Sequence, residues 1–212
     1  MPSPSVARTE DRIKELLQHT GLHRDFFKGK YCLDAGCGNG RFTYAMLHLG
    51  VSRVDSIDIS PEGIAKTKEV NPDYAQVKSI FELEPNPAYD FVLCWGVLNH
   101  VDKPREGFSK VTSQVKKGGV IHLMVYHKDL QAQYKEGRKK WRKWNDEERI
   151  QYCQKMIKEC GGDLHGWWDA LNPLYNWSWL EEEIEKWFEE EGFRDIKLVQ
   201  KYNINMRGVK NT

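Results

Sequence analysis

The chain contains 212 residues, of which 40% are apolar and 12% aromatic, so it can bury one sizeable core. Its formal net charge of +1 argues against a protein dedicated to nucleic-acid binding, and no apolar stretch approaches transmembrane length. The N-terminal sequence lacks the apolar core of a signal peptide, and the five cysteines are scattered without a Cys-x-x-Cys pair. We therefore expect a single domain, residues 1–212, that is cytoplasmic, does not contact a membrane, keeps its cysteines reduced and binds no structural metal.

The first predicted elements are a helix and a strand that ends in a glycine-rich turn. Apolar residues at helical spacing predict a helix over about residues 8–20, which Gly21 ends. Residues 31–40 read YCLDAGCGNG, a short apolar run that opens into Gly36, Gly38 and Gly40. A helical pattern follows at once, with Phe42, Ala45, Met46 and Leu49. A strand, a glycine turn and a helix in this order are typical of the nucleotide-binding corner of a doubly wound α/β sheet.

Two residues of this turn indicate which ligand it binds. A dinucleotide-binding turn needs a third glycine at the position that Arg41 occupies here. Asp34 places a carboxylate beside the turn, which repels a pyrophosphate but suits a cationic ligand. S-adenosylmethionine carries a sulfonium group, an ammonium group and no phosphate. The turn therefore favours this cofactor, with an NAD-dependent oxidoreductase as an open alternative.

Strands and helices then alternate, as in a parallel sheet. Residues 52–59 read as a second strand that ends in Asp58, at the spacing from the first strand at which α/β folds place a carboxylate on ribose hydroxyls. Ser60 and Pro61 begin the next helix. The remaining predictions are strands over residues 74–80, 89–95 and 120–126, and a helix from Pro104 to the Gly118-Gly119 pair. The fold class is α/β, Rossmann-like and doubly wound, with a mostly parallel sheet.

From residue 128 onwards the chain no longer alternates between strands and helices. Residues 128–177 hold a helix that Asn145 and Glu148 can cap, and four of the eight tryptophans: Trp141, Trp144, Trp167 and Trp168. Because ligands bind outside the carboxyl ends of the strands in such sheets, we predict that residues 128–177 form a helical lid after the fifth strand. Ser178 and Glu181 read as a capping box for a helix that Gly192 ends, before a final strand or hairpin.

Four segments resemble the motifs of class I S-adenosylmethionine-dependent methyltransferases, in the broad group that acts on small molecules. They cover the glycine turn, the second strand, the fourth strand with its following loop, and the entry to the fifth strand: residues 33–40, 54–61, 89–104 and 117–123. The resemblance implies S-adenosylmethionine as methyl donor and S-adenosylhomocysteine as product. One departure is the segment after the third strand, where the family often has an acid and this chain has Lys78, Ser79 and Ile80.

The resemblance also implies the site residues. Asp34 and the glycine turn are expected to line the methionine end of the cofactor, with Asp58 and Ile59 at the ribose and adenine. Ser79 and Ile80 are expected at the adenine edge and face, and the backbone of the fourth strand's end beside the sulfonium. The complete predicted set is Asp34, Gly36, Cys37, Gly38, Gly40, Asp58, Ile59, Ser79, Ile80, Cys94 and Trp95.

Methyl transfer is an in-line displacement, so positioning does most of the work and a base is needed only if the acceptor must lose a proton. His100 follows the fourth strand and Tyr126 and His127 close the fifth, so these three are the catalytic candidates. The predicted acceptor-binding residues are Asn99, His100, Tyr126, His127, His165 and Tyr175.

Two other functions stay open. Residues 135–144 interleave six basic residues with Trp141 and Trp144, a pattern that could contact phosphates and would make RNA the acceptor. The chain could also be a scaffold that binds the cofactor without catalysis. The identity of the acceptor, the atom that is methylated and the oligomeric state do not follow from the sequence.

Overall fold

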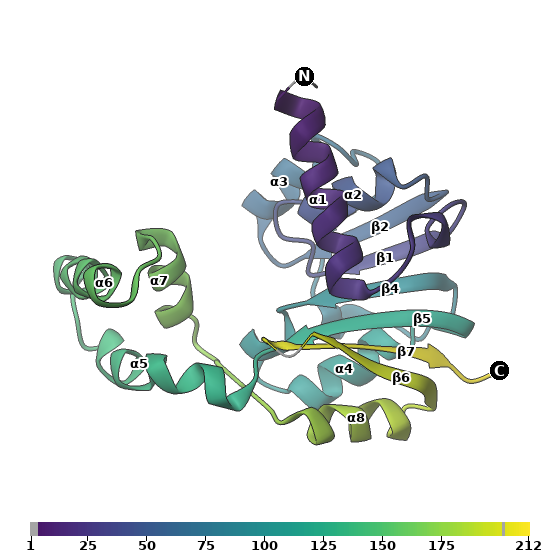
Figure 1. Cartoon of the computed structure of the whole chain (residues 1–212). Coiled ribbons are helices and arrows are strands. Elements are labelled where there is room, and N and C mark those ends of the chain that lie inside the picture. The colour runs from purple at the N-terminus through teal and green to yellow at the C-terminus, as the bar shows by residue number, and fades with distance from the viewer. Residues whose placement is uncertain (1–3, 201) are drawn as a thin grey trace.

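Seven strands form one sheet in the order β3-β2-β1-β4-β5-β7-β6 (Figure 1). The computed structural model describes residues 4–200 and 202–212, except for the side chains of residues 4–8, 132, 133, 165 and 169. The strands are β1 Tyr31–Ala35, β2 Arg53–Asp58, β3 Ala75–Val77, β4 Tyr89–Trp95, β5 Val115–Val125, β6 Phe193–Gln200 and β7 Ile204–Lys210. The first five strands pair in parallel, whereas β7 runs antiparallel to both β5 and β6. The predicted mostly parallel α/β sheet is therefore confirmed, and the end of the chain forms the predicted hairpin.

Helices cover both faces of the sheet, as a doubly wound fold requires. One apolar cluster joins α1 (Pro4–Thr20) and α2 (Arg41–His48) to the sheet through residues such as Leu16, Phe42 and Met46. A second cluster on the other face contains Phe108 of α4 (Pro104–Thr112) and Phe188 of α8 (Glu181–Glu190). α3 (Pro61–Lys68) packs beside β2 and β3, and short 3-10 helices follow β3 and β4: η2 (Ile80–Glu82) and η3 (Leu98–His100). A further short helix, η1 (Arg24–Phe26), precedes β1.

Two predicted boundaries are wrong, for local reasons. β5 begins at Val115, so Gly118 and Gly119 lie within a strand and do not end a helix. The pairing of β4 with β5 is irregular at this point, and a Cβ on Gly119 would lie 2.8 Å from the carbonyl oxygen of Tyr89. The glycines therefore belong to a bulge. The capping box also lies two residues later than predicted, since the Glu183 carboxylate accepts a hydrogen bond from the N–H of Leu180.

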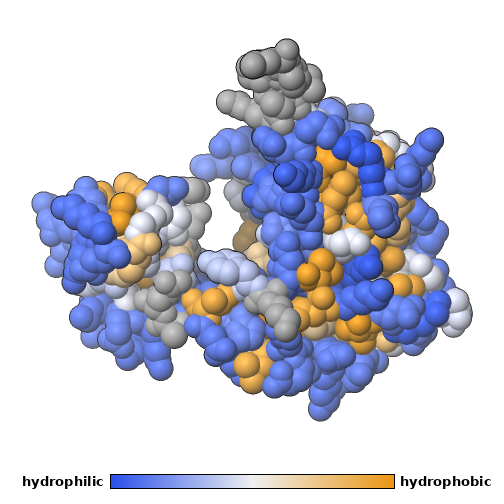
Figure 2. All heavy atoms as spheres, in the orientation of Figure 1, coloured by the Kyte–Doolittle hydropathy of each residue, from blue (hydrophilic) through white to orange (hydrophobic). Residues whose placement is uncertain are grey.

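Residues 128–177 form a helical lobe that projects from the carboxyl end of β5 (Figure 1). Its elements are η4 (Lys128–Tyr134), α5 (Lys135–Trp141), α6 (Asp146–Cys160) and α7 (Leu164–Leu171). The lobe has its own apolar core of Trp141, Cys153, Trp167 and Leu171. The predicted cap of α6 is present, because Asn145 and Glu148 each accept a hydrogen bond from the other's backbone N–H. In the space-filling view an open gap separates the outer part of the lobe from the body (Figure 2).

Among the described residues, no helix is long and apolar enough to cross a bilayer, and no group of His, Cys, Asp and Glu side chains could hold a metal ion.

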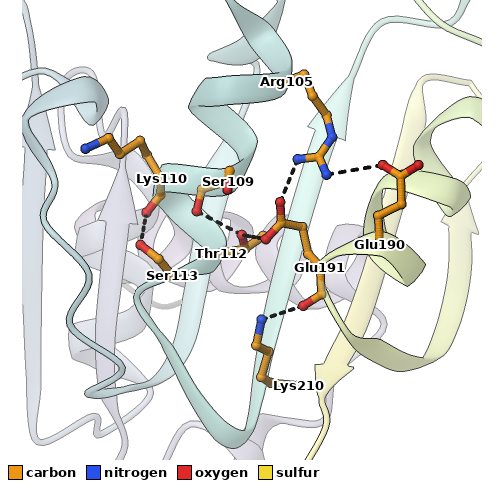
Figure 3. Close-up of polar contacts among 8 residues, drawn as sticks. All are labelled: Arg105, Ser109, Lys110, Thr112, Ser113, Glu190, Glu191 and Lys210. Atoms are coloured by element: carbon orange, nitrogen blue, oxygen red, sulfur yellow. Dashed lines mark hydrogen bonds and ion pairs between the residues drawn. The ribbon is translucent and has the colours of Figure 1, made fainter.

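One polar network ties α4 to the end of α8 (Figure 3). The Glu191 carboxylate accepts hydrogen bonds from the Arg105 guanidinium at 2.6 Å and from the Thr112 hydroxyl at 3.1 Å. Burial acts to raise the pKa of Glu191, but the hydrogen bonds from Arg105 and Thr112 outweigh it, so this pKa lies below its ordinary value. The ionised carboxylate therefore stabilises the folded state.

Replacing Glu191 by glutamine should lower the free energy of unfolding by about 1–3 kcal/mol at pH 7. Because folding lowers the pKa, the contribution is fully present above the unfolded-state value of about 4.3 and is lost as the pH falls through the folded-state value. Urea denaturation at pH 7 and at lower pH should show the difference from the wild type shrinking. Glu190→Gln is the control, because that side chain is 45% exposed and its contact with Arg105 is worth about 0.5 kcal/mol or less. Equal losses in the two variants would contradict this assignment.

Candidate active site

The glycine turn after β1 is tight enough to require glycine at two positions. Gly36 has φ +85°, and a Cβ there would lie 2.1 Å from Cγ2 of Val97. Gly40 has φ +78° at the start of α2, and a Cβ there would lie 2.8 Å from Oγ1 of Thr67. Both positions combine a left-handed backbone with a close neighbour, so a larger residue would distort the turn.

Asp58 joins this turn to the start of α3. One carboxylate oxygen accepts from the N–H of Gly38 and the other from the N–H of Ser60, both at 2.8 Å. Ser60 in turn caps α3 by accepting from the N–H of Gly63 at 3.0 Å, as the sequence predicts. Each carboxylate oxygen keeps a further lone pair, so Asp58 can still accept hydrogen bonds from a ligand.

A cavity of about 430 Å³ opens beside Asp58, at the carboxyl ends of β1, β2 and β4. Its volume lies within the range usual for ligand sites, about 300–1,000 Å³. Its lining consists of Gly36, Asp58, Ile59, Lys78, Ser79, Ile80, Phe81, Trp95, Gly96, Val97, His100, Val101 and Asp102. None of these lining residues belongs to the helical lobe.

The lining fits a nucleoside that carries no phosphate. Asp58 offers an acceptor for ribose hydroxyls, and the apolar side chains of Ile59, Ile80 and Phe81 offer a surface for a base. Lys78 is the one cationic side chain of the lining. A pyrophosphate needs a cluster of donors, which a single lysine does not provide. The Ser79 hydroxyl caps η2 by accepting from the N–H of Phe81 at 3.2 Å, so its lone pairs are partly used.

Several predicted cofactor residues do not line the cavity. Asp34 is 2% exposed and accepts a hydrogen bond from the Thr43 hydroxyl of α2 at 2.7 Å. Burial raises the pKa of Asp34 to about 6, although the hydrogen bond from Thr43 acts to lower it. The other residues that support the cavity without lining it are Cys37, Gly38, Gly40 and Cys94. The cysteines are buried, and burial raises the pKa of both thiols, so they remain protonated.

The loop after β4 holds His100 in a fixed orientation. Its Nδ1 lies 2.9 Å from the carbonyl oxygen of Tyr175, and its Nε2 lies 3.2 Å from the hydroxyl of Tyr126. A carbonyl can only accept, so Nδ1 must carry a proton, and in the neutral ring Nε2 accepts from the tyrosine. The structure thus brings two of the predicted catalytic candidates into contact.

The same loop is clamped by the segment that returns from the lobe. The Asn99 amide donates to the carbonyl oxygen of Trp177 at 2.8 Å, and the N–H of Trp177 donates to the carbonyl oxygen of Asn99 at 2.9 Å. The Trp177 indole N–H donates to the carbonyl oxygen of Val101, also at 2.8 Å. Asn99 is fully buried, and among the described residues its side-chain oxygen has no hydrogen-bond partner. This clamp fixes His100 to the segment that supplies the Tyr175 carbonyl.

Residues 7–198 match a family model described as a methyltransferase domain. The chain belongs to this family. The predicted resemblance to class I S-adenosylmethionine-dependent methyltransferases is therefore confirmed.

Individual relatives match parts of this methyltransferase. The mitochondrial ubiquinone biosynthesis O-methyltransferase of Schizosaccharomyces pombe is 32% identical over 117 residues, 51% of this chain and 42% of the relative. A tRNA U34 carboxymethyltransferase of Shewanella baltica is 32% identical over 131 residues, 58% of this chain and 38% of the relative. A structure titled as a putative S-adenosylmethionine-dependent methyltransferase from Listeria monocytogenes shares the fold, with a TM-score of 0.63 and 16% identity over all of both chains. The matches to these two curated relatives span less than half of each relative's length.

The methyltransferase has a second, smaller cavity next to Tyr126. Its volume is about 170 Å³, and it lies among the end of β5, the lobe and the turn between β6 and β7. Its lining consists of Tyr126, Leu130, Gln131, Tyr134, Arg138, Ala170, Tyr202 and Asn203. Since Tyr126 also contacts His100 of the larger cavity, the His100–Tyr126 pair stands between the two cavities.

The remaining predicted acceptor residues line neither cavity. His127 accepts from the N–H of Asp129 at 3.3 Å through Nδ1, and Tyr175 stacks on Trp177 with ring centroids 6.4 Å apart. The side chain of His165 lies outside the described part of the structure. Sequence reasoning missed Tyr134 and Tyr202 of the second cavity and did not place Arg138 there, because only the folded chain brings α5 next to the β6–β7 turn.

Proposed function

We propose that this methyltransferase acts on a small molecule that binds between the two cavities, with its reacting atom beside the His100–Tyr126 pair. The observation that carries the proposal is the position of this pair, since His100 lines the larger cavity and Tyr126 lines the smaller one at a contact of 3.2 Å. When bound, S-adenosylmethionine supplies an electrophilic methyl group on its sulfonium.

The larger cavity is the proposed cofactor site. Asp58 accepts from the ribose hydroxyls, Ile59, Ile80 and Phe81 enclose the adenine, and the backbone at Trp95 and Gly96 borders the methionine end. Support comes from the lining of the cavity and from its volume of about 430 Å³. Asp34 is proposed to support the site without contacting the cofactor, because its hydrogen bond with Thr43 holds α2 against the turn.

His100 and Tyr126 are proposed to position the acceptor and to take its proton when one must leave. Nδ1–H of His100 is held by the Tyr175 carbonyl, which directs the Nε2 lone pair towards the Tyr126 hydroxyl. A proton on the acceptor can then pass to Nε2 directly or through the tyrosine hydroxyl. An acceptor that reacts without losing a proton needs only the alignment that the pair provides.

An RNA acceptor is the second candidate, supported by the partial match to a tRNA U34 carboxymethyltransferase. In the structure, part of the basic segment 135–144 makes contacts within the lobe. Trp141 is 2% exposed in the lobe core, Arg138 donates to the Ala170 carbonyl at 2.9 Å, and Arg142 donates to the Leu174 carbonyl at 2.7 Å. These three residues hold the lobe together, which favours the small-molecule acceptor, whereas the four lysines of the segment are exposed. Salt-sensitive binding of tRNA at micromolar protein would reverse that preference.

Calorimetric titration with S-adenosylmethionine and with S-adenosylhomocysteine tests the proposed function first. We expect micromolar affinity for both ligands. If neither ligand binds, the proposed cofactor site is overturned and the scaffold alternative is favoured. A screen for label transfer from methyl-labelled S-adenosylmethionine to small molecules and to tRNA would then separate the two acceptor classes.

Replacing Tyr126 by phenylalanine should lower kcat for the acceptor found in that screen by about 10- to 100-fold, because the variant loses the hydroxyl that lies against Nε2 of His100. The affinity for S-adenosylhomocysteine should stay within about twofold, since Tyr126 does not line the larger cavity. Tyr175→Phe is the matched control, because its carbonyl and not its hydroxyl contacts His100. An unchanged kcat in Tyr126→Phe would exclude a role for the hydroxyl.

A further inference from the structure

Arg138 is a half-buried cation at the wall of the smaller cavity. Its Nε donates to the carbonyl oxygen of Ala170 at 2.9 Å, and one terminal nitrogen donates to the side-chain oxygen of Gln131 at 2.8 Å. Its guanidinium carbon lies 5.1 Å from the ring centroid of Tyr134. A guanidinium carries five N–H groups, so these contacts leave donors unused.

The charge of Arg138 is not neutralised within the part of the chain that the structure describes. None of the Asp and Glu side chains seen there forms an ion pair with it, and burial lowers its pKa. A half-buried cation without a counterion is costly, and an anion that entered the cavity would relieve that cost. The most favourable anion is one with two oxygens in a plane, because a carboxylate matches the fork of donors on a guanidinium.

The rest of the lining is uncharged, so it does not repel an anion. Tyr126, Tyr134 and Tyr202 bring hydroxyl groups, Gln131 and Asn203 bring amides, and no acidic side chain is present. Three aromatic rings around a volume of about 170 Å³ suit a planar group of about one ring. This volume is below that of a whole drug-sized site, about 300–1,000 Å³, so it fits a small acceptor or one end of a larger one.

We propose that the smaller cavity is the acceptor subsite and that Arg138 binds a carboxylate of the acceptor, so that the substrate class is a small carboxylic acid. This inference rests on the proposed function, and it explains how the acceptor is oriented. With its carboxylate on Arg138, the other end of the molecule lies towards Tyr126 and hence towards His100 and the larger cavity.

The test uses the full chain saturated with S-adenosylhomocysteine and three probes of equal ring size: benzoate, benzamide and phenyl phosphate. Binding is followed by tryptophan fluorescence or by NMR. We expect the wild type to bind benzoate at least tenfold more tightly than benzamide. Equal binding of these two probes would overturn the inference, and so would tighter binding of phenyl phosphate than of benzoate.

Two variants then assign the preference to one side chain. Arg138→Gln should lose at least tenfold in benzoate affinity and keep its benzamide affinity. Arg142→Gln is the matched control, because Arg142 also donates to a carbonyl of the lobe but does not line the cavity, so it should retain the preference for benzoate. A benzoate preference that survives in Arg138→Gln would refute the role of Arg138.

Arg138→Lys keeps the charge without the planar fork of donors. It should show a smaller preference for benzoate over benzamide, even if the glutamine variant disturbs the lobe. A benzoate preference equal to that of the wild type would contradict a contact between the guanidinium and both carboxylate oxygens. The titration with S-adenosylhomocysteine separates the two proposals. Binding of this product without a benzoate preference would overturn the acceptor class alone, whereas lack of product binding would overturn the proposed cofactor site.

Discussion

Replacing Gly36 by alanine is expected to lower the affinity for S-adenosylhomocysteine by at least about 100-fold, or about 2.7 kcal/mol. The new Cβ would lie 2.1 Å from Cγ2 of Val97, and φ at this residue is +85°. The left-handed conformation costs about 1–2 kcal/mol for an L-residue, and the collision adds to it. Because Val97 lines the larger cavity, relief of the collision moves it into the space that the cofactor is proposed to fill. Calorimetric titration of the purified variant measures the loss.

Two companion variants separate collision from backbone strain. Gly29 also has a left-handed backbone, with φ +72°, but a Cβ there meets nothing within 4 Å. Gly29→Ala should therefore lose stability and keep its affinity for the product. In the double variant Gly36→Ala/Val97→Ala the colliding methyl group is removed, so part of the affinity should return. No recovery in the double variant would show that strain in the turn is the whole cause.

Replacing Asp58 by alanine is expected to reduce product affinity by about 10- to 150-fold, or about 1.4–3 kcal/mol. The variant loses the proposed acceptor for the ribose hydroxyls. It also leaves the N–H groups of Gly38 and Ser60 without the carboxylate that now accepts from both at 2.8 Å. The second effect loosens the turn, so the loss exceeds that of a single surface hydrogen bond. Competition by adenosine and by its 2′,3′-dideoxy analogue isolates the first effect.

The wild type should prefer adenosine to the dideoxy analogue, and Asp58→Ala should lose that preference. Asp55→Ala is the matched control, since Asp55 lies on the same strand and accepts from Tyr89 and Arg53 at 2.8 and 2.7 Å, outside the cavity. It should lower the free energy of unfolding and leave the product affinity unchanged. Asp58→Ala protein that still discriminates between the two nucleosides would refute the ribose assignment.

The glycine turn and Asp58 could be placed from the sequence because neighbouring residues determine them. A run of apolar residues, three glycines and a helical pattern specify the turn, and strand length fixes where Asp58 falls. The side chain of Asp34 contacts Thr43 and does not line the cavity. Whether an acid at the end of a strand contacts a ligand or a neighbouring helix depends on how that helix packs. No local pattern reveals that choice.

The second cavity could not be predicted, for a related reason. Arg138 and Tyr202 are 64 positions apart in the chain, and they meet only because the lobe returns to the sheet and the last two strands form a hairpin. The tryptophans of the lobe do not mark this cavity, since Trp141 and Trp167 form the lobe's own core, which is the commoner role for tryptophans in such an insertion. The Gly118-Gly119 pair is also ambiguous in the sequence, since a bulge within a strand and the end of a helix both favour glycine.

The clamp between the η3 loop and residues 175–177 couples the lobe to His100. The carbonyl of Tyr175 fixes the proton on His100, and Trp177 is bonded to Asn99 and Val101 on either side of that histidine. A displacement of the lobe relative to the sheet must therefore either carry His100 with it or break these bonds. A ligand that contacts both the lobe and His100 is therefore expected to change the affinity for the cofactor, and the cofactor is expected to change the affinity for that ligand by the same factor. The backbone from residue 175 to residue 177 thus connects the lobe to the point where the two proposed ligand sites meet.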